Sequence, residues 1–255
     1  MMARSALRLL HYWWPPVLGW SLAVVIAHAS GQPIDRCGLV ALVAGILAAY
    51  SLDRAFDRSR AEQHGRLAFV LAPTALAASV VCAVAAWQLP WTNAVVVPVL
   101  GAASLLYPWL KRPLVTKVVL LPAIWTLAAI ALPFDDGTWF AWGTLRRPVT
   151  LPLFLLIGAG CLLCDLKDER SDRRAGVHSL PALLGNRSAA RIGLAVAIAG
   201  AGTALDCGEL ALAVGGALLG LAALRPTLLA TDVTGPLLVD VILTVPGALV
   251  ALGIR

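Results

Sequence analysis

The sequence predicts an all-α fold, a polytopic membrane protein with about nine transmembrane helices in one bundle. Of the 255 residues, 60% are hydrophobic and only 13% are charged, and the mean hydropathy is +0.84. Soluble domains are nearer half apolar and a quarter charged. A membrane-spanning helix takes about 20 residues, so this length accommodates about nine spans with short loops. We expect residues 1–255 to form a single transmembrane domain.

The apolar runs predict the helices one by one. They lie at residues 14–30, 37–53, 67–88, 93–109, 114–133, 149–165, 189–206, 208–224 and 236–253. Helix-breaking or acidic residues separate several of them, namely Pro33, Pro90, Pro113, Asp135 and Asp206. The third, seventh and eighth runs are rich in Ala and Gly. Small residues let membrane helices approach closely, which favours a compact bundle.

The Lys and Arg residues predict the orientation. With a cytoplasmic N-terminus, all but four of the 20 fall in cytoplasmic segments. The four exceptions are Arg36, Arg146, Arg147 and Arg255. Such an excess marks the cytoplasmic side. We therefore expect a multi-pass protein of the cell membrane, in contact with membrane lipid, and we do not interpret the net charge of +6 as a nucleic-acid signal.

Two acidic segments follow the second and sixth runs. In "YSLDRAFDRSRAE", residues 50–62, Asp53 and Asp57 are four apart. In "CDLKDERSDRR", residues 164–174, Asp165, Asp168 and Asp172 are spaced by three and four. On a helix each set shares one face. Carboxylates are unfavourable at the negative end of a helix dipole, so a cation between them is favoured.

Magnesium is the cation that this pattern favours. Mg²⁺ is held by one or two carboxylates together with water and substrate phosphates. Two acidic segments bordered by Lys and Arg therefore indicate a Mg²⁺–diphosphate site, where positive charge would stabilise a leaving group. For either segment alone, a solvated helix face with ordinary ion pairs remains an equal alternative.

The second segment resembles a motif of the UbiA superfamily of intramembrane prenyltransferases. "DLKDERSDRRAGVHSLPALLG" is similar to the family's D-x-x-D-x-x-x-D followed by G-x-x-(T/S)-L-P-x-x-x-G. The second part is carried by Gly176, Ser179, Leu180, Pro181 and Gly185. The resemblance covers nearly the whole chain.

Two further stretches bear on the same resemblance. "LYPWLKR", residues 106–112, is similar to the family's Tyr-x-x-x-Lys, at Tyr107 and Lys111. The first acidic segment matches N-x-x-x-D-x-x-x-D at Asp53 and Asp57 but has Ala49 at the Asn position.

The resemblance implies Mg²⁺-dependent transfer of a prenyl group from an isoprenoid diphosphate to a small-molecule acceptor, aromatic or lipid, at the cytoplasmic mouth. The implied catalytic and metal-binding residues are Asp53, Asp57, Asp165, Asp168 and Asp172. The implied substrate-binding residues are Arg54, Tyr107, Lys111, Lys167 and Arg173.

Three other functions are weighed against transfer. A UbiA-like terpene cyclase would ionise the same substrate without an acceptor, and a degenerate homologue would bind lipid without catalysis. A transporter is disfavoured, because transporter sites lie near the midplane. Asp240, within the last run, is either a functional intramembrane group or an interfacial residue.

Overall fold

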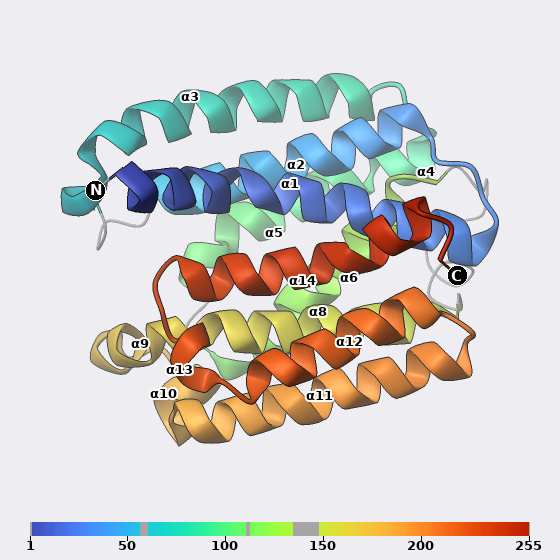
Figure 1. Ribbon diagram of the computed structural model, residues 1–255. Coiled ribbons are helices and arrows are strands. Elements are labelled where there is room, and N and C mark those ends of the chain that lie inside the picture. Colours follow the sequence, from blue (N-terminus) through green and yellow to red (C-terminus); the bar gives the residue numbers. More distant parts are fainter. Residues whose placement is uncertain (1, 57–60, 111–112, 135–147, 255) are drawn as a thin grey trace.

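The computed structural model describes residues 2–56, 61–110, 113–134 and 148–254. In these ranges the secondary structure is helical and contains no strand (Figure 1). The predicted all-α class is therefore confirmed. Long helices lie side by side along one direction, and short helices and turns gather at their ends (Figure 1).

The first half of the chain forms one side of the bundle. Its helices are α1 (Met2–Ser30), α2 (Arg36–Phe56), α3 (Ala61–Ala86), α4 (Trp91–Ala94), α5 (Val96–Leu110), the π-helical turn η2 (Thr116–Leu120) and α6 (Leu121–Ala131). Helix α2 packs between α3 and α1 and also contacts α5. Helix α2, whose last turns carry Asp53, therefore has three helical neighbours.

The second half forms the other side. Its elements are α8 (Thr150–Cys164), the 3₁₀ turn η3 (Asp165–Asp168), α9 (Glu169–Ala175), α10 (Leu180–Leu184), α11 (Asn186–Asp206), α12 (Leu210–Ala223), α13 (Pro226–Leu229) and α14 (Thr234–Ala251). Helix α11 packs against α8 and α12, and α14 packs against α1 and α12. The first and last long helices thus join the two halves.

Several helices have the length and composition of membrane spans. Four segments qualify fully, at residues 36–55, 150–175, 186–206 and 234–251, and shorter apolar helices lie at 70–86, 91–107, 116–131 and 210–223. Within the described ranges, each predicted apolar run coincides with a helix or with two consecutive ones. The number that cross the membrane stays a prediction.

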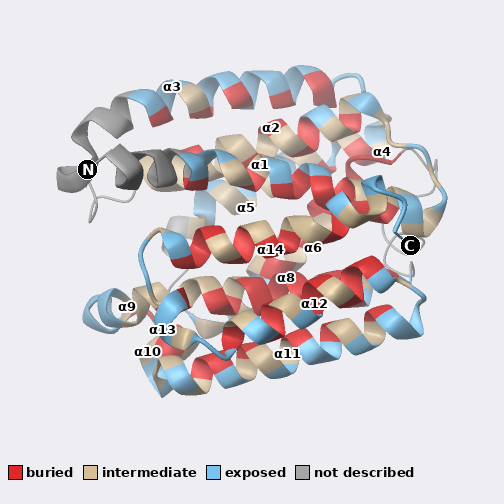
Figure 2. Ribbon diagram, viewed as in Figure 1, coloured by how far each residue is buried: buried red, intermediate tan, exposed pale blue. Residues whose placement is uncertain are grey.

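Small residues set the spacing of the helices that carry the second acidic segment. A Cβ atom on Gly160 of α8 would lie 2.7 Å from Leu243 Cδ1 of α14, and one on Gly193 of α11 would lie 2.9 Å from Leu163 Cδ2. Both leucines belong to the buried core that joins α1, α8, α11, α12 and α14 (Figure 2). Close packing therefore fixes α8 between α11 and α14 just before Asp165.

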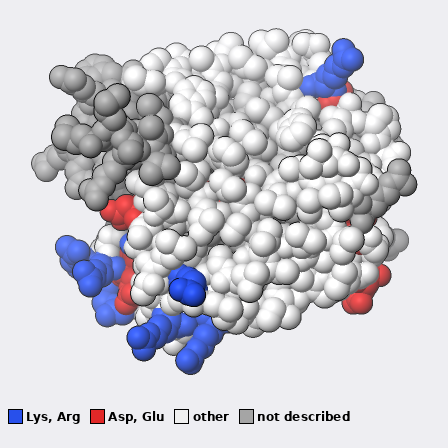
Figure 3. All heavy atoms as spheres, viewed as in Figure 1, with Lys and Arg blue, Asp and Glu red and all other residues white. Residues whose placement is uncertain are grey.

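Charge is concentrated at one end of the molecule. Lys and Arg side chains gather around α9, α10 and the start of α11, at the left of the view, while the middle of the bundle shows almost no charge (Figure 3). The exposed cations of this end include Arg170, Arg173, Arg174, Arg191 and Arg225. This distribution suits a protein whose middle is surrounded by hydrocarbon.

Candidate active site

The second acidic segment begins where α8 tightens into a 3₁₀ turn. Helix α8 ends at Cys164, η3 covers Asp165–Asp168, and α9 continues to Ala175. Gly176 then adopts a left-handed conformation with φ +68°, which glycine reaches without steric cost. The Val177 N–H donates to the Asp172 carbonyl at 2.9 Å. The chain is thereby turned back immediately after its last aspartate.

The G-x-x-S-L-P-x-x-x-G motif builds this return. Ser179 is completely buried, and its hydroxyl accepts the Ala182 N–H at 3.4 Å, capping α10. Pro181 lies in the first turn of α10, where its missing N–H costs nothing. Arg173 Nε donates to the Ala182 carbonyl at 3.2 Å, which ties α9 to α10. The motif therefore has a structural role, holding the acidic turn in place.

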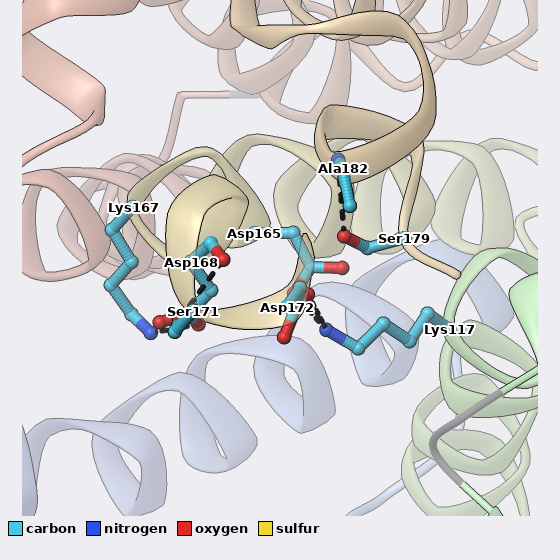
Figure 4. Close-up of polar contacts among 8 residues, drawn as sticks. All are labelled: Lys117, Asp165, Lys167, Asp168, Ser171, Asp172, Ser179 and Ala182. Atoms are coloured by element: carbon cyan, nitrogen blue, oxygen red, sulfur yellow. Dashed lines mark hydrogen bonds and ion pairs between the residues drawn. The ribbon is translucent and has the colours of Figure 1, made fainter. Parts of the chain in front are cut away.

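Two of the three aspartates converge on one lysine. Lys117 Nζ lies 2.8 Å from Asp172 Oδ2 and 3.3 Å from Asp165 Oδ1 (Figure 4). The lysine comes from η2, and only 8% of its side chain is exposed. From the sequence alone, Lys117 is only one of the predicted cytoplasmic cations. No spacing rule could pair it with residues 48 and 55 positions away.

The third aspartate has a different partner. Asp168 Oδ2 forms an ion pair with the neighbouring Lys167 (Figure 4), and its carbonyl accepts the Ser171 hydroxyl at 3.0 Å. Asp168 has φ −94° and ψ 2°, outside the α-helical range. The expected single helical face is therefore interrupted, and the three carboxylates divide between two lysines.

Tyr107 is influenced electrostatically by residues of both acidic segments. It lies at the C-terminal part of α5 and is half-buried. Asp53 of α2, together with Asp165 and Asp172, lies within electrostatic range of its hydroxyl. Tyr107 and residues of both acidic segments therefore share one electrostatic environment. The other two predicted site residues of this region, Asp57 and Lys111, lie outside the described ranges.

Arg54 faces a second polar group. Its Nη2 lies 3.2 Å from His11 Nε2 of α1, and its guanidinium carbon lies 6.0 Å from the centre of the Tyr50 ring. Arginine can only donate, so His11 Nε2 accepts and the ring proton sits on Nδ1. That nitrogen lies 3.8 Å from Asp240 Oδ2 of α14. The predicted diphosphate ligand Arg54 is therefore held by α1.

The structure also places the remaining predicted residues. Arg173 pairs with Glu169 at 3.2 Å, and 62% of its side chain is exposed. Asp240 is 5% exposed, so it is a buried residue of the bundle and does not lie in a solvated interface. His11 had no role in the sequence analysis, because its contacts depend on the packing of α1 against α2 and α14.

The carboxylates at this charged end of the bundle are suitable ligands for Mg²⁺. Carboxylate oxygens are its preferred protein ligands, and one or two suffice when water and phosphate oxygens complete the shell. In the part of the chain that the structure describes, no three His, Cys, Asp or Glu side chains form a ready metal-binding group. The facing carboxylates of Asp165 and Asp172 supply a pair, and the Lys117 ammonium lies against both.

Comparison with known proteins bears on these features. A sequence profile of the UbiA prenyltransferase family matches residues 17–234. The fold is similar to a solved structure described as the apo structure of a UbiA homolog from Aeropyrum pernix K1, with a TM-score of 0.69 and 19% identity. The match covers 94% of this chain and 98% of that one. Curated proteins give no match.

Proposed function

The chain belongs to the UbiA prenyltransferase family, and from this membership we propose that it transfers a prenyl group from an isoprenoid diphosphate to a small-molecule acceptor within the membrane. The observation that carries the proposal is the pair of ion contacts that Lys117 makes with Asp165 and Asp172 at the charged end of an apolar bundle. A substrate with an anionic head and a hydrocarbon tail matches that arrangement.

The substrate would lie with its diphosphate among the charged side chains and its tail along the apolar helices. Asp165 and Asp172, with Asp53, are the proposed Mg²⁺ ligands, and Asp57 and Asp168 complete the predicted set. Bound Mg²⁺ would neutralise charge that builds up on the diphosphate. Lys167 and Arg173, which already pair with Asp168 and Glu169, are proposed to add positive charge around the diphosphate, and Lys111 and Arg54 stay predicted substrate-binding residues.

The reaction starts with cleavage of the bond between the allylic carbon and the diphosphate oxygen. The electron pair leaves with the diphosphate, and the prenyl carbon becomes a cation. The acceptor then forms a bond to that carbon and loses a proton. The chain's own contribution is a dry apolar wall that keeps water from the cation and a positively charged mouth that holds the leaving group.

The charged end is proposed to face the cytoplasm. Most of the Lys and Arg side chains visible in Figure 3 gather there, and an excess of Lys and Arg marks the cytoplasmic side of membrane proteins. The isoprenoid diphosphate would therefore enter from the cytoplasm or the inner leaflet.

The test is diphosphate release from purified protein in detergent, with geranylgeranyl diphosphate and Mg²⁺, with and without a panel of aromatic acceptors. We expect release to need Mg²⁺ and to fall at least about a hundredfold in Asp165→Ala and Asp53→Ala, because each removes a proposed ligand of the Mg²⁺ that would neutralise the leaving group. Asp206→Ala is the matched control, since Asp206 ends α11 and is exposed. Unchanged release in both site variants would contradict the proposal.

Ala49 is the observation that keeps a second function in view. It replaces the family's Asn one turn before Asp53 on α2, and Ala cannot bind or orient a metal ligand. A terpene cyclase would release diphosphate without any acceptor, so acceptor dependence separates it from a transferase. A lipid-binding homologue would release none, and Ala49→Asn is the substitution that tests restoration.

A further inference from the structure

The two ion pairs of Lys117 carry an inference that rests on the proposed function and extends it. The ammonium is in contact with Asp172 Oδ2 at 2.8 Å and with Asp165 Oδ1 at 3.3 Å. These are the carboxylates that are proposed to bind the divalent cation. Without a ligand, the mouth therefore carries its own counter-ion.

The backbone of η2 fixes the position of Lys117, while its long side chain can still change partners. Lys117 lies in the π-helical turn η2, which contacts α8 directly and continues into α6. Short π-helical turns inside helices are frequent at functional sites. The flexible four-carbon stem of lysine lets the ammonium change partners while the helix stays in place. Its burial, with 8% of the side chain exposed, means that water cannot easily replace the carboxylates.

The charges decide what happens when ligands bind. Asp165 and Asp172 contribute two negative charges, and the ammonium of Lys117 balances one of them. A divalent cation on the same oxygens would bring three positive charges together, so it has to displace the ammonium. A diphosphate brings further negative charge and offers the displaced ammonium new oxygen partners.

We propose that Lys117 is a built-in counter-ion that makes divalent-cation binding at Asp165 and Asp172 depend on the diphosphate. Without diphosphate, the cation must break both ion pairs of Lys117 and the ammonium is left buried without a carboxylate. With diphosphate, the ammonium moves to the phosphate oxygens. Because coupling between two ligands is reciprocal, the bound cation strengthens diphosphate binding by the same factor.

The test uses Mn²⁺ as the probe and needs no catalysis. Binding of Mn²⁺ to the purified full chain in detergent is measured by the electron paramagnetic resonance signal of free Mn²⁺, without diphosphate. Lys117→Met keeps the stem and removes the charge. We expect it to bind Mn²⁺ at least about tenfold more tightly than wild type, equivalent to about 1.4 kcal/mol. Lys117→Arg keeps the charge, so its affinity should stay as weak as that of wild type.

Arg174→Gln is the control for net charge. Arg174 is exposed on α9, and its Nε donates to the Arg170 carbonyl at 3.2 Å. An equal gain in Arg174→Gln would overturn the inference, because any lost cation would then act alike. No gain in Lys117→Met would also overturn it.

A folding defect in Lys117→Met leaves the inference testable. The melting temperature is then followed as Mn²⁺ is added. Stabilisation of Lys117→Met by Mn²⁺, lost when Asp172→Asn is added, supports the inference, and absence of stabilisation overturns it. If wild type shows no diphosphate release while Lys117→Met gains Mn²⁺ affinity, the counter-ion is supported and the proposed transfer is refuted.

Discussion

Gly216 of α12 gives a quantitative test of the helix packing that supports the site. A Cβ atom at this position would lie 2.8 Å from Ala201 Cβ, 2.9 Å from Leu156 Cδ2 and 3.0 Å from the Ala197 carbonyl oxygen. Carbon atoms pack best at about 3.5–4.0 Å, so the new methyl group overlaps three neighbours. The carbonyl belongs to the backbone of α11 and cannot rotate away.

The expected size of the effect follows from two opposed terms. Overpacking of a close-packed core costs about 1–3 kcal/mol, whereas Ala is favoured over Gly inside a helix by about 1 kcal/mol. Gly216→Ala should therefore lower the free energy of unfolding by up to roughly 2 kcal/mol. Gly202→Ala on α11 is the control, because no heavy atom lies within 4 Å of its added Cβ. That variant should be as stable as wild type or slightly more stable.

Reversible unfolding in mixed detergent micelles, titrated with sodium dodecyl sulfate, measures both variants. Gly216→Ala should unfold at a lower detergent fraction than wild type and Gly202→Ala at an equal or higher one. If both variants are stabilised alike, α12 does not approach α11 and Leu156 of α8 as closely as described.

Three other predictions concern a cap, a buried amide and an acidic residue. Ser179→Ala removes the hydroxyl that accepts the Ala182 N–H and should cost about 1 kcal/mol, seen as a lower melting temperature that Ser179→Thr largely restores. Asn93→Ala removes the amide that donates to the Ala131 and Phe134 carbonyls at 2.9 and 2.6 Å and should cost about 1–3 kcal/mol, because buried carbonyls lose their donor; an unchanged unfolding midpoint would contradict those bonds. Burial raises the pKa of Glu209, and the nearby His28 opposes the shift. The ionised form of Glu209 therefore lowers the stability of the folded state at pH values above its folded-state pKa. Glu209→Gln should melt at a higher temperature than wild type at pH 7, and scanning calorimetry should show this difference vanishing at acid pH.

The helices were predictable from the sequence because each is encoded locally. The run at 149–165 became α8 at Thr150–Cys164, since an apolar stretch between charged segments is enough to define its ends. The position of Asp165 at a helix end follows from the same pattern. The cap at Ser179 also has a local signal, a Ser before a Leu-Pro pair, and could have been assigned without any resemblance.

The partners of the charged side chains were not predictable in this way. Lys117 meets Asp165 and Asp172 only because η2 packs against α8, a contact between distant parts of the chain. The family resemblance implied that Arg54 binds substrate, and only the packing of α1 against α2 brings its guanidinium to His11. Spacing along one helix carries information about that helix alone.

The hydrogen bonds of Ser21 have a consequence for how the protein is made. Its hydroxyl donates to the Thr244 carbonyl at 3.0 Å and accepts the Gly247 N–H at 3.2 Å, across 223 and 226 residues of sequence. At about 5–20 residues per second, the ribosome needs roughly 11–45 s to reach the second partner. During that interval the Ser21 hydroxyl has neither of its two partners on α14. The packing of α14 against α1 is therefore completed only late in synthesis. A ribosome stalled before α14 would leave the side of α1 that faces α14 uncovered and open to quality control.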